Sequence, residues 1–306
     1  MDAPRSLLVL GGSGFLGAQV VRSALAIGFE RVVCASRDPN AAPREADTRL
    51  VRVAFDLANL GGVEELLRAS GARAVVHCAA MARVADCERE PARAMLVNAL
   101  AAQALAEASA RLAIRLVLVS TDLVFGRRSP PRPSGFVETD EPGPLSQYGE
   151  SKLLGEQLAL SHGSDVLVVR LPLLFGDSLG RALGATDSVV AAVERGEAPV
   201  LFADEWRTPL DVTDAARALL ELAASSERGL LHVAGPKRLD RVQLGLAALE
   251  ARGFGPLEAR SKIRIGTRAD HPHATPRPAD VSLDASQARA RLATRLRNAA
   301  DALRDR

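Results

Sequence analysis

The chain has 306 residues, of which 47% are hydrophobic and 25% are charged, a composition that excludes a largely disordered protein. Its 39 basic and 37 acidic residues leave a net charge of +2, without the basic excess of a nucleic-acid-binding protein. No apolar run reaches the roughly 18 residues that a membrane span needs, and no signal peptide is recognisable before the first predicted strand. We therefore expect a cytoplasmic protein without nucleic-acid or membrane partners.

The first part of the chain alternates short apolar runs with helical patterns. Strands are predicted at 6–10, 31–35, 50–55, 72–79, 115–120 and 165–171. Helices are predicted at 14–27, 62–70, 91–110 and 147–161. Strands that alternate with helices pair in parallel through right-handed crossovers, and fully apolar strands are typical of a sheet covered on both faces. The pattern predicts an α/β fold of the Rossmann type, with a doubly wound parallel sheet.

After Leu171 this rhythm weakens, and irregular segments are predicted at 176–188, 203–211 and 266–281. Further strands are predicted at 198–202 and 229–235, and further helices at 189–195, 212–223 and 284–304. We read the last of these helices as amphipathic and solvated. We expect residues 1–170, completed by parts of 205–235, to form the Rossmann domain. Residues 171–306 would mainly form a smaller, mixed α/β substrate lobe.

Cysteine and histidine residues give no sign of a metal site. Cys34, Cys78 and Cys87 form no CxxC pair, and we expect small buried side chains in a reducing compartment. His271 and His273 flank a proline in a predicted loop, and we assign no metal to them.

A glycine-rich segment, GGSGFLG at 11–17, follows the first predicted strand and opens the first predicted helix. Gly11 permits a tight turn, Gly14 lets the backbone approach a pyrophosphate, and Gly17 allows close helix packing. The N-terminus of the helix then offers free N–H groups and a positive dipole to phosphates. This placement predicts a dinucleotide-binding domain. The other residues of the segment expected to contact the cofactor are Ser13, Phe15 and Leu16.

The residues that end the second and third strands should select the cofactor. NAD enzymes carry an acidic residue about 20 positions after the glycines, whereas here Ser36 and Arg37 occupy that place. A guanidinium beside a hydroxyl suits a 2′-phosphate, so NADP(H) is favoured. Asp38, the next residue, could instead bond to the ribose, which makes NAD(H) the alternative cofactor. Asp56, followed by Leu57, either contacts the adenine or caps a helix.

Two further motifs carry the candidate chemistry. In YGESK, Tyr148 and Lys152 are four residues apart and project from one face of a helix. A neighbouring cation favours the phenolate of a tyrosine, whose pKa is otherwise near 10. Ser120 and Thr121 end the fifth strand, where strand termini face the ligand crevice of such folds. We predict proton transfer by Tyr148, supported by Thr121 and Lys152. Tyr148 and Lys152 are also expected to contact the cofactor, Lys152 at the nicotinamide ribose.

At this point the sequence resembles the extended short-chain dehydrogenase/reductase superfamily and, within it, the dTDP-4-dehydrorhamnose reductases. The motifs that carry this resemblance occur in that family's order and span nearly the whole chain. They are GGSGFLG, VVHCAAMARVADCE (75–88), VNALAAQALAEA (97–108), STDLVFG (120–126), YGESKLLGE (148–156) and RPADVSLD (277–284).

The resemblance implies further roles for residues of this chain. It implies cofactor contacts for Ala79, Ala80, Met81, Asn98 and Ser120. It implies substrate contacts for Asp122, Leu123, Trp206, Arg207 and Arg277. The implied substrate is a nucleotide-linked keto sugar, and the implied assembly is a homodimer.

Three functions fit these patterns. The first is an NADP(H)-dependent reductase of a keto sugar. The second is an NAD(P)-dependent epimerase or dehydratase of the same fold, although Leu123 stands where dehydratases carry a glutamate. The third is a non-catalytic, NADP-binding regulatory subunit, against which the retained Tyr148 and Lys152 argue.

Overall fold

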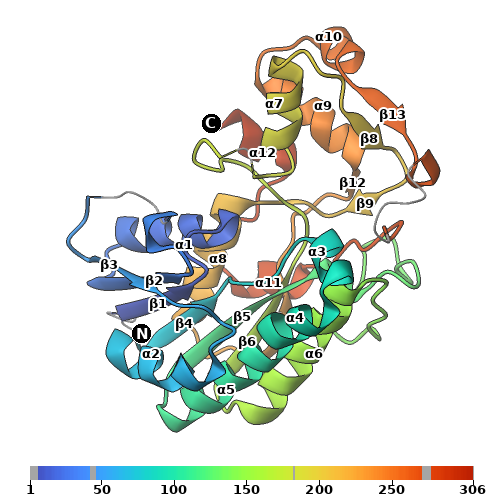
Figure 1. Ribbon diagram of the computed structural model, residues 1–306. Coiled ribbons are helices and arrows are strands. Elements are labelled where there is room, and N and C mark those ends of the chain that lie inside the picture. The colour runs from blue at the N-terminus through green and yellow to red at the C-terminus, as the bar shows by residue number, and fades with distance from the viewer. Residues whose placement is uncertain (1–5, 42–45, 182, 271–276, 306) are drawn as a thin grey trace.

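Figure 1 shows a computed structural model of the chain, which describes residues 6–41, 46–181, 183–270 and 277–305. Within these residues, seven strands form the central sheet. They are β1 (Ser6–Leu10), β2 (Arg31–Ser36), β3 (Leu50–Ala54), β4 (Ala74–His77), β5 (Arg115–Thr121), β6 (Val166–Leu171) and β11 (Gly229–His232). Their order is β11-β6-β5-β4-β1-β2-β3, and every neighbouring pair is parallel. The expected Rossmann-type α/β fold is confirmed.

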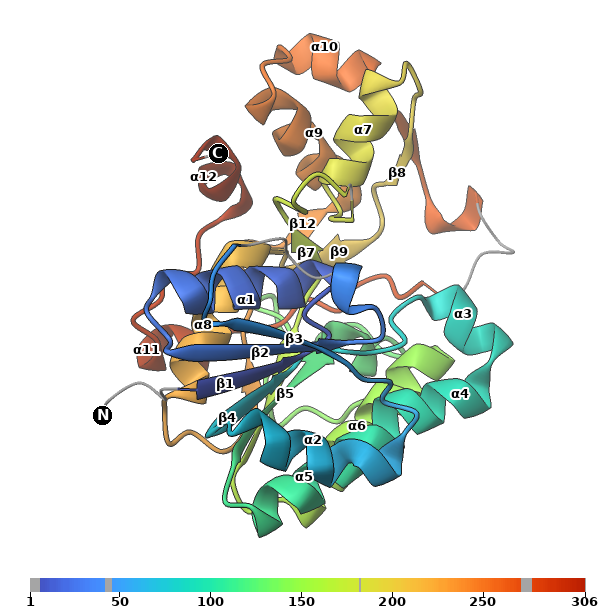
Figure 2. The ribbon, with the colours of Figure 1, turned by 60° about the vertical axis from the view of Figure 1, so that its left-hand side comes forward.

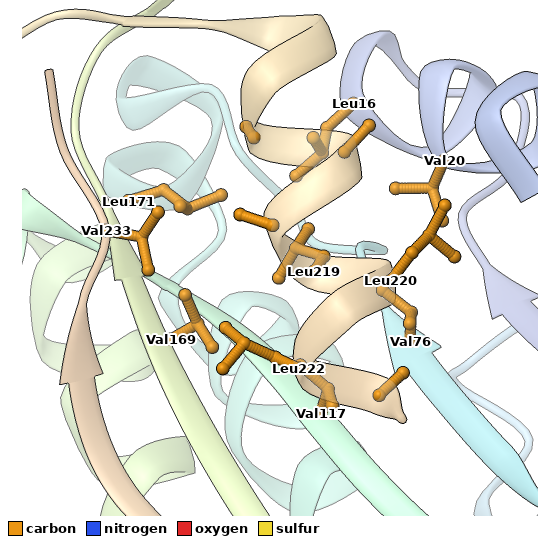
Figure 3. Close-up of a cluster of buried hydrophobic side chains, with 14 of the residues drawn as sticks. Leu16, Val20, Val76, Val117, Val169, Leu171, Leu219, Leu220, Leu222 and Val233 are labelled. Carbon is orange, nitrogen blue, oxygen red and sulfur yellow. The ribbon is translucent and has the colours of Figure 1, made fainter. Parts of the chain in front are cut away.

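Helices cover both faces of this sheet, as Figures 1 and 2 show. One face carries α1 (Phe15–Ala26), α8 (Val212–Ala223) and α11 (Ser286–Arg291), and the other carries α2 (Val63–Ser70), α5 (Ala101–Arg111) and α6 (Gln147–His162). Figure 3 shows the packing on the first face, where leucines of α8 lie between α1 and side chains of the strands. The labelled side chains there are Leu16, Val20, Val76, Val117, Val169, Leu171, Leu219, Leu220, Leu222 and Val233. Burial on both faces explains why the strands are apolar without alternation.

The strand order places a crevice at the carboxyl ends of the central strands. From β1 the chain proceeds through β2 to β3 on one side, and from β4 onward on the other. At such a reversal the connections leave the carboxyl ends of β1 and β4 in opposite directions, and ligands bind in the gap between them. The glycine-rich segment follows β1, and Ala79–Met81 follow β4.

A second group of elements stands on this end of the sheet, at the top of Figures 1 and 2. It contains α7 (Asp187–Glu194), α9 (Arg241–Ala251), α10 (Pro256–Ser261), α12 (Ala299–Arg304) and the parallel pair of β8 (Val200–Phe202) with β13 (Arg264–Gly266). These elements share a hydrophobic core of their own. Between the two groups run two short pairs, β7 (Leu174–Phe175) with β10 (Leu210–Asp211), and β9 (Trp206–Arg207) with β12 (Leu239–Asp240). The division into two domains at residue 171 stays a prediction.

The expected single helix over 284–304 is wrong. The chain forms α11 and α12 there, with a non-helical segment between them. In that segment the N–H groups of Ala293 and Thr294 bond to the carboxylate of Glu221, and Arg297 binds Asp214 with an N–O distance of 2.7 Å. These tertiary bonds replace helical ones, so Arg297 is not a solvated side chain.

The sequence patterns also missed several elements. Helix α3 (Val84–Arg89), α9 and α10 were not expected, and the segment predicted as irregular at 203–211 contains β9 and β10. The strand predicted at 72–79 is limited to β4. In the described part of the chain, no helix combines the length and apolar character needed to cross a membrane.

Candidate active site

The glycine-rich loop has the shape that a pyrophosphate requires. Gly11 has a φ of +77°, and a Cβ there would lie 2.7 Å from backbone atoms of Ala79. A Cβ at Gly17 would overlap the carbonyl oxygen of Gly11. Helix α1 begins after Gly14, and no side chain caps it. Its first N–H groups are therefore available to an anion, and the cradle fits a dinucleotide phosphate.

A cleft of about 730 Å³ lies along this loop and the ends of β1, β2, β3 and β4. Twelve of the expected cofactor residues line it: Gly11, Ser13, Gly14, Phe15, Leu16, Ser36, Arg37, Asp56, Leu57, Ala79, Ala80 and Met81. Five do not: Gly17, Asn98, Ser120, Tyr148 and Lys152. The cleft thus joins segments that are far apart in the sequence.

Sequence reasoning missed part of the lining. Among the unpredicted lining residues are Phe55, beside Asp56, and charged side chains of the segment after Met81, namely Arg83, Asp86, Arg89, Glu90 and Arg93. The charged residues belong to α3 and to α4 (Pro91–Met95), or lie next to them. They were missed because α3 was not recognised as an element. Their place after β4 was the one available signal, since that strand end borders the crevice.

Two polar residues that line the cleft after β2 and β3 have local partners. The hydroxyl of Ser36 donates to the carbonyl oxygen of Asp38 at 2.8 Å, and Ser36 is buried. Asp56 is exposed and accepts a hydrogen bond of 3.0 Å from the N–H of Ala58. Arg37 is exposed and lines the cleft, which leaves it the most accessible cation at the end of β2.

Asn98 does not line the cleft, but its side chain binds the backbone of Met81, which does. Its Oδ1 accepts from the N–H of Met81 at 2.8 Å, and its Nδ2 donates to the carbonyl oxygen of Met81 at 3.1 Å and to Ser151 Oγ at 2.9 Å. The residue sits in a π-helical turn, Leu96–Leu100, that interrupts the helix predicted over 91–110. Such turns often mark functional sites because they redirect side chains. Here Asn98 ties the cleft to α6.

Helix α6 carries the predicted acid–base pair. Ser146 caps its start by accepting a hydrogen bond of 3.2 Å from the N–H of Gly149, so Tyr148 lies in the first turn. Tyr148 forms a side-chain hydrogen bond with Thr121, which ends β5. Lys152 lies one turn further and is only 4% exposed. The structure therefore brings Thr121, Tyr148 and Lys152 together as the sequence predicts.

The protonation of this group follows from burial. Burial raises the pKa of Tyr148 above its ordinary value, and the hydrogen bond with Thr121 opposes the shift. Burial lowers the pKa of Lys152 to about 8, and the carboxylate of Glu156 opposes that change. The phenol is consequently a proton donor at neutral pH, and Lys152 titrates just above neutrality.

Thr121 connects the phenol to a buried carboxyl group. Its hydroxyl donates to Asp122 Oδ1 at 3.2 Å and accepts from the N–H of Leu123 at 3.1 Å. Burial raises the pKa of Asp122 to about 6. The other oxygen, Oδ2, is buried without a hydrogen bond and faces Arg207 Nε at 3.6 Å.

Ser120 belongs to the interior and does not reach the cleft. Its hydroxyl bonds to Glu156, which accepts from Arg170 Nη2 at 2.7 Å. Arg170 also lies over the ring of Phe125 at 5.0 Å and within 3.4 Å of His232 Nε2. This buried network fixes α6 against β5 and β6, and its members come from separate elements that no local motif joins.

The expected substrate residues fall into two places. Arg207 is buried, and Glu205 joins it to Arg277, with N–O distances of 3.4 and 3.2 Å. Together with Asp122 they form a charged chain from β5 into the second group of elements. Trp206 instead lines a separate, shallower hollow of about 580 Å³ and stacks under Arg238 at 4.0 Å.

The cysteines are not arranged as a metal site. Cys34 and Cys87 are buried, Cys78 is half-buried at the cleft, and burial raises the pKa of each thiol. Among the described residues, no group of three or more His, Cys, Asp or Glu side chains could hold a metal ion. His271 and His273 lie outside the described residues.

Comparison with known proteins places this geometry in a family. The family model described as the RmlD substrate binding domain matches residues 5–306. The dTDP-4-dehydrorhamnose reductase of Mycobacterium tuberculosis is 30% identical over 283 residues, covering 92% of this chain and 85% of that protein. Methionine adenosyltransferase 2 subunit beta of Xenopus tropicalis is 29% identical, covering 92% and 81%.

Solved structures show the same fold. A hypothetical dTDP-4-dehydrorhamnose reductase from Sulfolobus tokodaii superposes with a TM-score of 0.77 at 28% identity, covering 96% of this chain and 97% of that one. The Bacillus anthracis dTDP-4-dehydrorhamnose reductase in complex with NADP gives 0.83 at 20% identity, covering 100% and 98%. The dTDP-glucose 4,6-dehydratase DesIV of Streptomyces venezuelae, with NAD bound, gives 0.79 at 25% identity, covering 97% and 95%. With the family match over nearly its whole length, this chain belongs to the RmlD substrate-binding-domain family of the extended short-chain dehydrogenase/reductase superfamily.

Proposed function

We propose that this protein is an NADP(H)-dependent oxidoreductase that reduces the ketone of a nucleotide-linked keto sugar. The observation that carries the proposal is the hydrogen-bonded pair of Tyr148 and Thr121, with the buried ammonium of Lys152 one helical turn away. This group is tied through Asn98 to Met81, which lines the dinucleotide cleft. This hydrogen-bonded tie links the proton donor to the wall of the cleft.

Tyr148, Thr121 and Lys152 would each have a separate role in this reaction. A bound reduced nicotinamide supplies the hydride. The protonated phenol of Tyr148 donates its proton to the alkoxide oxygen that forms from the ketone. Thr121 contributes a hydroxyl to the same oxygen and helps to stabilise its developing charge. Lys152 stabilises the phenolate left on Tyr148 through its positive charge.

Arg37 supports NADP(H) as the preferred cofactor. It is an exposed cation at the end of β2 that lines the cleft, at the position where NAD enzymes carry an acidic residue. Asp38 follows directly, but its carboxylate accepts the N–H of Asn40 at 2.9 Å. A guanidinium and a 2′-phosphate form charge-assisted hydrogen bonds, which a 2′-hydroxyl cannot match.

The charged chain between the two groups of elements supports an anionic substrate. Arg207 and Arg277 share the single carboxylate of Glu205, and Arg241 lies close enough for its charge to interact with all three. Positive charge therefore exceeds what Glu205 and Asp122 balance, which favours the diphosphate of a nucleotide sugar.

A second candidate function is that of a non-catalytic regulatory subunit. Similarity to the beta subunit of methionine adenosyltransferase 2 supports it. Tyr148 and Lys152, together with Thr121, argue for chemistry. An epimerase with a retained NAD(P) would use the same tyrosine but would not consume cofactor.

The deciding experiment follows the loss of NADPH absorbance with purified protein and a panel of nucleotide-linked 4-keto sugars. NADH and the Tyr148→Phe variant serve as controls. We expect one keto sugar to be reduced, with turnover falling by about 10²-fold or more in the variant, because a positioned acid contributes that much. NADPH binding without consumption on every sugar would refute the reductase and leave the epimerase and regulatory functions.

A further inference from the structure

A loop of the second group of elements reaches back onto the glycine-rich loop. It begins after β7, and its tip carries Arg181. The Nη1 of Arg181 donates to the carbonyl oxygen of Ser13 at 2.5 Å, and its Nη2 donates to that of Gly14 at 3.4 Å. The two partners are 168 and 167 residues away in sequence. Both line the dinucleotide cleft.

The root of this loop is fixed independently of Arg181. The buried side chain of Gln19, on α1, donates to the carbonyl oxygen of Asp177 at 2.7 Å. Ser178 Oγ donates to Asp187 Oδ2, in the first turn of α7, at 2.6 Å. A Cβ at Gly184 would lie 2.9 Å from the ring of Phe15, so the loop also packs closely on α1. Removal of the Arg181 side chain therefore leaves the loop anchored.

Peptide geometry explains what the contacts of Arg181 achieve. A peptide group is planar and trans, so a carbonyl held in one direction points its N–H in the opposite direction. The carbonyl of Gly14 shares its peptide plane with the N–H of Phe15, the first residue of α1. The carbonyl of Ser13 shares its plane with the N–H of Gly14, which bonds to Gly11 at 2.9 Å. The carbonyl of Gly14 also accepts the helical bond from the N–H of Ala18 at 3.0 Å. Arg181 thus adds a side-chain contact to each of two peptide planes that otherwise have one backbone bond each.

We infer that Arg181 is a positioning residue through which the second group of elements holds the glycine-rich loop ready for the cofactor diphosphate. Its carbonyl contacts orient the backbone N–H groups at the start of α1, and its charge adds to the positive end of that helix. This inference rests on the proposed dinucleotide-dependent function. It adds a residue outside the glycine motif, from the lobe expected to bind substrate.

A comparison of two probes separates this role from general stability. NADP⁺ contains the diphosphate, whereas adenosine 2′-monophosphate has the adenosine and its 2′-phosphate but neither phosphate of the diphosphate. For Arg181→Met we expect NADP⁺ to bind about fivefold more weakly, corresponding to about 1 kcal/mol, and adenosine 2′-monophosphate to bind as in the wild type. Calorimetric titration of the apo-protein measures both constants without turnover.

The matched control is Arg195→Met. Arg195 is an exposed arginine of the same group of elements and pairs only locally with Glu197 at 2.8 Å among the contacts described for it. It should leave both constants unchanged. Equal NADP⁺ affinity in Arg181→Met and the wild type would overturn the inference, as would an equal loss for both probes. A wild-type protein that binds no dinucleotide would instead overturn the proposed function itself.

Discussion

The ammonium group of Lys152 donates a hydrogen bond of 2.7 Å to the carbonyl oxygen of Val119, two residues before Thr121 on β5. Because burial lowers the pKa of Lys152 to about 8, the group is charged below that pH and neutral above it. We expect kcat/KM for ketone reduction to be level near neutrality and to fall as the pH rises through about 8. A pH profile with saturating NADPH measures this limb. Lys152→Arg stays charged throughout, so a limb that persists in it belongs to another group.

Glu156 should determine the pH at which kcat/KM begins to fall. Its carboxylate raises the pKa of Lys152 against the effect of burial, so Glu156→Gln should move the alkaline limb to lower pH. The same change removes the partner of buried Arg170, and we expect unfolding to become about 3 kcal/mol easier. Denaturant unfolding therefore precedes the kinetics. The control is Glu150→Gln on the same helix, whose carboxylate lies 3.6 Å from exposed Arg127. Identical limbs in both variants would refute the role of Glu156.

Arg37 offers a test of cofactor choice. Arg37→Ala should weaken NADPH binding by about tenfold and leave NADH binding nearly unchanged, because only the 2′-phosphate loses a charged hydrogen-bond partner. Fluorescence titration of both cofactors gives the ratio of dissociation constants. Arg31→Ala, at the opposite, exposed end of β2, is the control. Equal losses for NADPH and NADH would show that Arg37 does not contact the 2′-phosphate.

The sequence predicted most of the Rossmann fold because two local periodicities describe it. Apolar runs marked β1–β6, and the glycine spacing at 11–17 marked the phosphate loop. The YGESK spacing placed Tyr148 and Lys152 on one helical face, and the end of the fifth strand placed Thr121 near them. Each of these signals lies within a few neighbouring residues, so it could be recognised without knowing the rest of the structure.

The remaining features depend on contacts between distant segments. The pairing of Ser120 with Glu156 and Arg170 joins three elements, and no pattern within any one segment indicates that these side chains meet. Arg181 meets Ser13 across 168 residues. The helical pattern at 284–304 was locally sound, but tertiary bonds to α8 overrode it.

Asn98 should contribute to stability as well as to the site. Asn98→Ala leaves the N–H and carbonyl of Met81 without their side-chain partner in a half-buried place, so we expect a loss of about 2 kcal/mol in unfolding free energy. Denaturant unfolding measures it. The control is Gln103→Ala on α5, whose amide bonds only to Glu107 at 2.8 Å among the described contacts. A loss no larger than the control's would mean that the Met81 backbone finds other partners.

Replacement of Arg297 distinguishes the observed C-terminal segment from a single solvated helix over 284–304. It donates to Asp214 at 2.7 Å and to Asp211 at 3.3 Å, and both carboxylates are almost fully buried. Arg297→Met removes the guanidinium from both buried carboxylates, and we expect the free energy of unfolding at neutral pH to fall by about 3 kcal/mol.

Urea unfolding at neutral pH measures the loss. Arg295→Met is the matched control, since Arg295 is 81% exposed and lies 3.7 Å from Asp301. A solvated helix over 284–304 would give both variants the same small effect, whereas the observed packing requires a large effect for Arg297 alone.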